Sequence, residues 1–252
     1  MTVSRDELLA YLNEQLNVAN IRDFCPNGLQ VQGKASIQKV VTGVTASQAL
    51  IDHAIEQQAD ALLVHHGYFW KNEAAPIVGM KQRRIKALLA NDVNLFAYHL
   101  PLDVHPRWGN NAQLAALMNW QVAGPAEPHD PACALMLGHC GAIASDELAQ
   151  QLQQRLEREL SCYVPVQRPI KRLAWCTGGG QGFIDQAAAL GVDAFITGEV
   201  SEQTVHSARE QDIAFFAAGH HATERYGAKA LGEHLQQQFG LDVQFVDMDN
   251  PA

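Results

Sequence analysis

The sequence predicts an α/β protein built from two similar α/β domains that arose by internal duplication. Short apolar runs rich in β-branched residues alternate with amphipathic helical patterns, as in parallel sheets whose strands are buried on both faces. One such strand–helix–strand stretch begins at Thr45 and a similar one begins 133 residues later, at Gly178. A proline-rich segment lies between the two copies. Chance similarity between two β-α-β units is the alternative to duplication.

The first half opens with a helix. Ser4 and Glu7 have the spacing of a capping box, and leucines recur after them at helical intervals. Turn chemistry over residues 26–30 ends this segment. A β-α-β unit and a further strand follow, over residues 37–44, 47–58, 61–64 and 92–99.

The second copy aligns with the first without a gap. Identical pairs stand at Gln48/Gln181, Ile51/Ile184, Asp52/Asp185, Ala54/Ala187, Asp60/Asp193 and Ala61/Ala194. The prolines of residues 124–131 mark the best linker, so we expect domains over 1–125 and 126–252, with the C-terminal strand returning to the first domain. The other elements expected in the second half are a strand over 133–140, a helix capped by Ser145, and strands over 163–166, 194–197 and 214–218.

Charge and composition exclude several classes of protein. The chain has 252 residues, 47% of them hydrophobic, and a formal net charge of −9, which disfavours a nucleic acid polymer as partner. No signal-peptide pattern opens the sequence and no stretch approaches a membrane span, so we expect a soluble, cytoplasmic protein with no membrane partner. The five cysteines show no C-x-x-C pairing and are interpreted as reduced structural thiols.

Metal-ligating side chains gather where strands end. Ligand sites of α/β sheets lie beyond the carboxyl ends of parallel strands, and three such ends carry His65 with His66, His99 with Asp103, and His220 with Glu224. Imidazoles and carboxylates together suit a two-metal site. A single histidine after a strand is more often an ordinary core or surface residue, and adjacent histidines of a strand point to opposite sides, so His65 and His66 could be one ligand and one bystander.

Two further features have open interpretations. The loop of residues 178–182 is glycine-rich and could cradle a phosphate group through its N–H groups, or be only a tight turn. Glu199 occupies the place in the second copy that His66 holds in the first, and His206 stands on the following helix. Both are candidates to line the pocket, and a solvated surface position is the alternative for each.

At these residues the sequence resembles the GTP cyclohydrolase 1 type 2 homologues, also called the NGG-interacting-factor-three-like proteins. The resemblance spans nearly the whole chain and rests on the motifs PNGLQV, GVTAS, HHGYFWK, HLPLD, TGGG, TGE and GHHATE. It is closest to the short bacterial form of the family. The resemblance implies two α/β domains with a dinuclear metal site in the cleft between them, and a ring-shaped homohexamer.

The resemblance also implies a ligand set. The metal ligands would be His65, His66, Asp103, His220 and Glu224, with Glu224 bridging two divalent ions drawn from Zn, Fe, Mn or Ni. Three further histidines would lie beside the metal site without being primary ligands: His99, His105 and His221. Gly67 departs from the family, many of whose members carry proline there, and we expect it to loosen the loop without removing a ligand.

The expected function is hydrolysis. A metal-bridging water would attack a nucleotide-like or phosphorylated small molecule, and GTP cyclohydrolase-type ring opening is one such reaction. Lys71 and Arg225, beside the metal motifs, are candidates to add positive charge for a phosphate. The alternative is a non-enzymatic metal carrier or a regulatory binding module.

Overall fold

The computed structural model describes residues 1–252 and divides the chain into two compact units. Unit 1 comprises residues 1–109 and 227–249, and unit 2 comprises residues 110–226 and 250–252. These ranges differ from the expected 1–125 and 126–252, because residues 110–125 pack within unit 2 and much of the C-terminal region packs within unit 1. No helix is long and apolar enough to cross a membrane.

Unit 1 contains a five-stranded sheet with the order β13-β4-β5-β6-β2 and a two-stranded sheet of β1 and β3. Strands β13, β4, β5 and β6 run parallel, and β2 is antiparallel to β6. The elements are β1 (Val3–Ser4), α1 (Arg5–Gln15), η1 (Val18–Asn20), β2 (Gly28–Val31), β3 (Ser36–Ile37), β4 (Lys39–Thr45), α2 (Gln48–Glu56), β5 (Ala61–His66), α3 (Gly79–Ala90), β6 (Asn94–Ala97), α4 (Leu100–Asp103), the second part of α9 (His220–Phe239) and β13 (Asp242–Phe245). The C-terminal strand β13 therefore pairs with β4 at the edge of this sheet.

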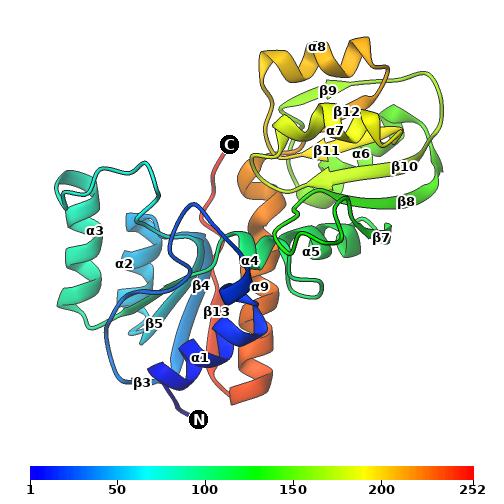
Figure 1. Cartoon of the computed structure of the whole chain (residues 1–252). Coiled ribbons are helices and arrows are strands. Elements are labelled where there is room, and N and C mark those ends of the chain that lie inside the picture. The colour runs from blue at the N-terminus through cyan, green and yellow to red at the C-terminus, as the bar shows by residue number, and fades with distance from the viewer. The chain divides into compact units, whose positions relative to one another are not determined.

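Helices cover both faces of the unit 1 sheet, which explains why its strands are continuous apolar runs. Figure 1 shows α2 and α3 on one face, where Leu50 and Leu88 join the core with Leu62. On the other face, α1 and α9 pack against Leu63, which follows Leu62 in β5 and points to the opposite side of the sheet. The predicted cap of α1 is confirmed, because the Ser4 side chain accepts a hydrogen bond from the N–H of Glu7.

Unit 2 contains a six-stranded sheet with the order β7-β8-β10-β11-β12-β9. Its central strands β10, β11 and β12 run parallel, and the outer strands are antiparallel to their neighbours. The elements are α5 (Asn110–Leu117), β7 (Gln121–Pro125), β8 (Met136–Ile143), α6 (Ser145–Leu156), β9 (Cys162–Val164), β10 (Ile170–Cys176), η2 (Gln181–Phe183), α7 (Ile184–Ala189), β11 (Ala194–Thr197), α8 (Glu202–Glu210), β12 (Ala214–Ala217) and the start of α9.

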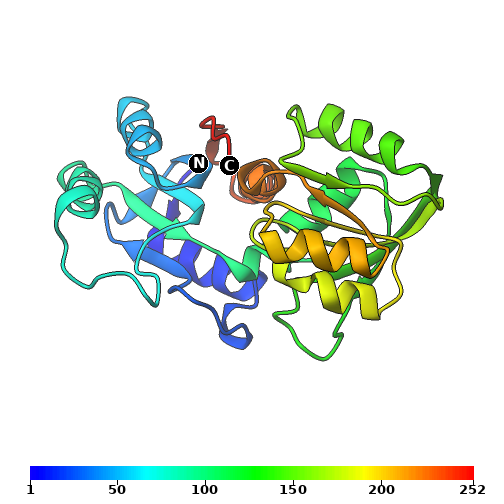
Figure 2. The same cartoon turned by 90° about the horizontal axis from the view of Figure 1, so that it is seen from above.

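The helices of unit 2 also cover both faces of its sheet. In Figure 2, α7 and α8 run side by side, and both contribute to the core around Phe195 and Phe215. The opposite face packs α5 and α6 against Trp175 and Phe216. Ser145 does not cap α6 as predicted; Ala144 is the N-cap residue, and the Ser145 hydroxyl instead exchanges hydrogen bonds with the backbone of Val166.

Each unit has an aspartate at the matching position that makes the same two hydrogen bonds. Oδ2 of Asp60 accepts the backbone N–H groups of Gln38 and Lys39, and Oδ2 of Asp193 accepts those of Lys171 and Arg172. The parallel ladders also share their register, since Val40 pairs with Ala61 and Leu173 with Ala194. Each partner is displaced by the same 133 residues, which is what duplication of an α/β unit predicts.

Candidate metal centre

His65 is a buried imidazole whose two nitrogens have different surroundings. It stands one residue before the end of β5, and its Nδ1 lies 2.9 Å from the carbonyl oxygen of Tyr98. A carbonyl can only accept, so Nδ1 carries the hydrogen and Nε2 is the nitrogen that could bind a metal. Nε2 lies 3.4 Å from Oδ1 of Asp103, a carboxylate that is itself buried at the end of α4.

Two more histidines of unit 1 join His65. The Nδ1 of His66 lies 3.1 Å from the hydroxyl of Thr45, and one ring nitrogen each of His65, His66 and His99 lies within 4.8 Å of the others. His66 is therefore not a bystander on the far side of the strand. His99 was expected only as a neighbour, and its ring centroid lies 5.1 Å from that of His65 and 5.8 Å from that of His66, against 4.4 Å between the two predicted ligands.

The loop before β2 supplies residues that the sequence analysis missed. Both carboxylate oxygens of buried Asp23 are used: Oδ1 lies 2.8 Å from His99 Nδ1 and Oδ2 accepts from the N–H of Leu100. Burial alone would raise the pKa of Asp23, but the hydrogen bond and the charge of His99 outweigh burial and lower that pKa. Cys25 also lies within 4.8 Å of this pair, and burial and the nearby carboxylates of Asp23 and Asp103 raise the pKa of its thiol to about 12 in the metal-free protein.

The signal for this loop was present in the PNGLQV motif. Its asparagine, Asn27, accepts the backbone N–H of His99 through Oδ1 and donates to Asp23 through Nδ2. Loop 23–27 thus fixes both the backbone and the ring of a histidine more than seventy positions away. The motif supported the family resemblance, but periodicity gives no indication of such a long-range contact.

Unit 2 repeats the arrangement of an anchored imidazole facing a carboxylate. The Nδ1 of His220 lies 2.6 Å from Oε1 of Glu199, and its Nε2 lies 3.2 Å from Oε2 of Glu224, one helical turn along α9. Burial lowers the pKa of His220, but hydrogen bonds and charge from Glu224 and Glu199 outweigh it and raise that pKa to about 9. Glu199 is therefore a direct partner of a predicted ligand.

The glycine-rich loop 178–182 brings its backbone against these side chains. Gly178 has a φ of +65°, and a Cβ there would overlap Oε1 of Glu224. Two loop N–H groups are engaged internally: that of Gly178 donates to the Thr223 hydroxyl and that of Gly180 to the Thr197 hydroxyl. The loop therefore acts as a tight turn that lets backbone approach Glu224, which weakens the phosphate-cradle interpretation.

Other candidates lie away from these two clusters. His206 is exposed on α8. Arg225 donates to the carbonyl oxygen of Leu156 and lies over the ring of Tyr226, so its guanidinium has a structural role. The ring of His105 stacks on Trp108 with centroids 4.4 Å apart.

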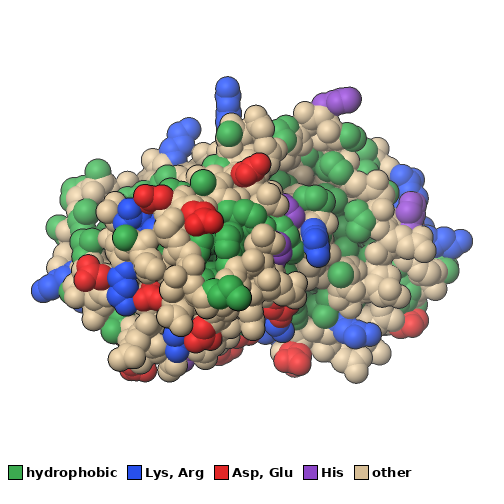
Figure 3. All heavy atoms as spheres, turned by 90° about the horizontal axis from the view of Figure 1, so that it is seen from below, with side chains coloured by type: hydrophobic (Ala, Val, Ile, Leu, Met, Phe, Trp, Pro, Cys, Tyr) green, Lys and Arg blue, Asp and Glu red, His purple; other side chains and the backbone are tan.

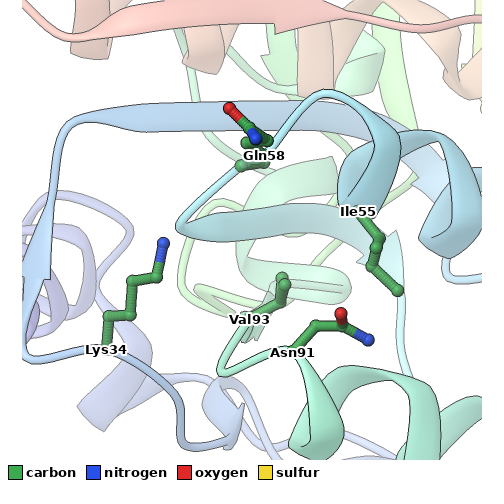
Figure 4. Close-up of a pocket in the computed structure, with 6 residues that line it drawn as sticks. Lys34, Ile55, Gln58, Asn91 and Val93 are labelled. Atoms are coloured by element: carbon green, nitrogen blue, oxygen red, sulfur yellow. The ribbon is translucent and has the colours of Figure 1, made fainter.

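One pocket of unit 1 is not part of the metal centre. Figure 4 shows Lys34, Gln58 and Asn91 around a pocket of about 490 Å³, completed by Ile55, Ala59 and Val93. Residues 58–60 precede β5 and residues 91–93 precede β6, so the pocket lies at the amino ends of the strands, opposite the histidines. Its one ammonium group, Lys34 Nζ, lies 2.6 Å from Asp60.

Comparison with protein families gives a match over nearly the whole chain. The sequence model described as Duf34/NIF3 (NGG1p interacting factor 3) matches residues 3–251. A Yersinia pestis protein called "GTP cyclohydrolase 1 type 2 homolog" is 57% identical over 251 residues, covering 98% of each chain. A Pseudomonas aeruginosa protein of the same name is 54% identical and covers all of both chains.

Solved structures share the fold. A structural-genomics structure described as a protein of unknown function superposes with a TM-score of 0.95 at 56% identity, covering 99% of this chain and 100% of the other. A Thermus thermophilus protein superposes with a TM-score of 0.88 at 32% identity, with the same coverage. The mixed α/β fold seen here is therefore shared by these relatives over their full length.

Proposed function

Because the chain belongs to the Duf34/NIF3 family, we propose that it is a hydrolase that uses two divalent cations per chain. The observation that carries the proposal is the same arrangement in each unit. Nδ1 of His65 bonds to the Tyr98 carbonyl while its Nε2 faces Asp103, and Nδ1 of His220 bonds to Glu199 while its Nε2 faces Glu224. Two acceptor atoms at such a distance suit a cation that both can bind.

The proposed ligands come from both units and are His65, His66, Asp103, His220 and Glu224. Three imidazoles and two carboxylates suit Zn, Fe, Mn or Ni. We assign Glu224 as the bridging carboxylate. Glu199 orients His220, and Asp23 orients His99, in the way that outer partners fix the rings of metal-ligating histidines.

A pair of such ions would lower the pKa of a bound water towards neutrality and polarise the bond under attack. The chain's own contribution is to hold the imidazoles in the ligating tautomer and to keep the Asp23 carboxylate ionised. The Tyr98 carbonyl does the first for His65. The lowered pKa of Asp23 keeps it ionised, so that it can hold the His99 ring.

We propose a small nucleotide-like or phosphorylated molecule as the substrate, with GTP-type ring opening as one reaction to test. The name of these relatives, GTP cyclohydrolase 1 type 2 homolog, refers to that activity. A nucleic acid polymer is disfavoured by the net charge of −9, and on the face shown in Figure 3 Lys and Arg side chains are interspersed with Asp and Glu. With Arg225 committed to Leu156, Lys71 remains the candidate charge for a phosphate group.

The experiment is a turnover assay on metal-reconstituted protein, with Glu224→Gln as control. A hydrolase releases product over many cycles and saturates with substrate, and the variant does not. The competing hypothesis, a metal carrier or regulatory module, predicts exchange of ions and no repeated product release with any nucleotide. Competition among nucleoside triphosphates, nucleosides and single-stranded oligonucleotides tests the substrate class. Equal affinity for a nucleoside and its triphosphate would show that the site does not recognise the phosphate groups.

We also propose the ring-shaped homohexamer that the family resemblance implies. Light scattering at low micromolar concentration should give about six times the 27.6 kDa of one chain. A mass near that of one chain would refute the assembly without affecting the ligand set.

A further inference from the structure

The segment after His66, residues 67–73, is held in place on several sides. Gln30 bonds to the backbone of Tyr68 in both directions, accepting its N–H at 2.7 Å and donating to its carbonyl oxygen at 3.1 Å. The buried Tyr68 hydroxyl donates to the carbonyl of Ala46. Gly67 packs where a Cβ would meet Gln30, so it permits close packing rather than the loosening that we expected.

Phe69 is in an unusual backbone conformation within this segment. Its φ is +64°, a region that bulky residues rarely adopt and that persists where the surroundings enforce it. The carboxylate of Glu73 enforces it by accepting the N–H groups of Phe69 at 2.6 Å and Trp70 at 3.2 Å. Lys81 supports both, because its Nζ lies 3.4 Å from Glu73 and 4.9 Å from the centre of the Phe69 ring.

The consequence of this turn is the position of Trp70. Its indole lies edge-on to His99, with ring centroids 4.9 Å apart and planes at 82°, and 6.0 Å from the ring of His66. The indole N–H donates to the carbonyl of Gly67 at 3.3 Å, which fixes the ring further. A half-buried tryptophan is thus oriented beside two histidines of the candidate centre.

A second aromatic residue stands on the adjacent loop. Phe24 is 61% exposed, although its backbone is well fixed: its N–H donates to Asp23 and its carbonyl accepts the N–H of Lys71 at 2.7 Å. Exposed aromatic rings offer faces on which planar groups stack, and this is how proteins bind bases without reading their edges.

We propose that Trp70 and Phe24 form a ring-binding wall beside the metal centre, and that the substrate carries a planar heteroaromatic ring. This inference rests on the proposed function, because the wall is assigned to the substrate of that same centre. It assigns recognition of the ring to unit 1, and it makes Trp70 and Phe24 determinants of specificity. Neither residue is proposed to take part in bond cleavage.

Tryptophan fluorescence tests the wall directly. Of the four tryptophans, Trp108 and Trp120 are each 7% exposed and Trp175 is fully buried, so a stacking ring can reach only Trp70. Guanosine should quench the wild-type emission and ribose 5-phosphate should not. Trp70→Phe should abolish the quenching while equilibrium dialysis still shows guanosine binding, and Trp120→Phe should leave the quenching intact.

Affinity measurements separate the wall from the metal centre. Trp70→Ala and Phe24→Ala should each weaken guanosine binding about tenfold, the order expected for a stacked base, with unchanged affinity for ribose 5-phosphate and unchanged metal content. Phe24 is exposed enough that its variant should fold normally even if Trp70→Ala does not. Wild-type guanosine affinity in Phe24→Ala together with quenching retained in Trp70→Phe would overturn the proposal.

Metal content keeps the two proposals distinguishable. Protein that binds no metal but still binds guanosine through Trp70 and Phe24 would refute the hydrolase and leave the wall standing. Protein with both ions that binds guanosine no better than ribose 5-phosphate would refute the wall and leave the metal centre standing.

Discussion

Glu199 holds the Nδ1 atom of His220 at 2.6 Å. The same ring directs Nε2 to Glu224 at 3.2 Å, just as His65 directs Nε2 to Asp103 while the Tyr98 carbonyl holds its Nδ1. The two units therefore orient an imidazole by different means, a carboxylate in one and a backbone carbonyl in the other. A carboxylate can be removed by substitution, which makes unit 2 the place to test orientation.

Glu199→Gln should weaken metal binding by about 10- to 100-fold, the usual effect of losing the outer partner of a ligating histidine. The amide keeps a hydrogen bond to His220 but not the charge that favours the ligating tautomer. Competition with a chromogenic chelator gives the affinity. His206→Ala is the matched control, because His206 is exposed on α8 and should have no effect. Equal loss in both variants would show that Glu199 has no special part.

Gly178→Ala should disturb the centre through Glu224. The new Cβ would overlap Oε1 of Glu224, at a φ of +65° that disfavours alanine, so either the loop or the carboxylate must move. We expect lower metal content and a drop in unfolding free energy of more than about 1 kcal/mol. Gly182→Ala is the control, since its Cβ would meet nothing within 4 Å. Unchanged metal content in Gly178→Ala would contradict the close approach.

Glu224→Gln should reduce activity far more than His105→Ala does. The amide offers one neutral oxygen and cannot bridge two cations. His105 stacks on Trp108 and accepts the backbone N–H groups of Arg107 and Trp108, so its loss should cost about 1–3 kcal/mol of stability rather than activity. Steady-state rates and urea denaturation of both variants make the comparison. Full activity with both ions bound in Glu224→Gln would leave only a helix-end role for this carboxylate.

The stability of the metal-free protein should fall between pH 6.5 and about 4. Burial, and then the charges of His234 and Arg107, lower the pKa of His105 to about 4. In this window the unfolded chain, with a histidine pKa of about 6.5, binds a proton that the folded chain does not, so the free energy of unfolding declines as pH falls. Urea denaturation from pH 7 to 4 should show a shallower decline for His105→Ala.

His220 acts in the opposite direction and in another window. Its pKa is raised to about 9, so its contribution to the stability of the metal-free protein is full below pH 6.5 and is lost as pH rises through 9. A His220→Gln variant should lose that alkaline dependence and keep the acidic one. The opposite pattern would mean that Glu199 and Glu224 do not act on this ring.

The fold was largely predictable because its strands are buried on both faces and its repeat is in register. The sequence showed that Asp60 and Asp193 are identical residues at matching positions of the two copies. The structure adds the reason, because each carboxylate accepts two backbone N–H groups at the start of the preceding strand. The ranges of the two units were less predictable, because the 20-residue helix α9 contributes to both units and leads into β13, which pairs with β4. Periodicity does not indicate which sheet a strand joins.

The candidate site was predictable where ligands follow strands. The contributions of Asp23 and Asn27 were not, because both lie in an irregular loop and meet His99 only through the tertiary fold. Trp70 was part of a quoted motif, but its contact with His99 depends on the positive φ of Phe69, which no residue pattern announces.

The stoichiometry of bound metal tests the central claim most directly. Protein stripped with chelator, reconstituted in turn with Zn, Mn, Fe or Ni and freed of excess ion should contain two ions per chain by elemental analysis. The double variant of His65→Ala and His220→Ala should lose both. A wild-type content well below one ion per chain with every metal would contradict the dinuclear centre.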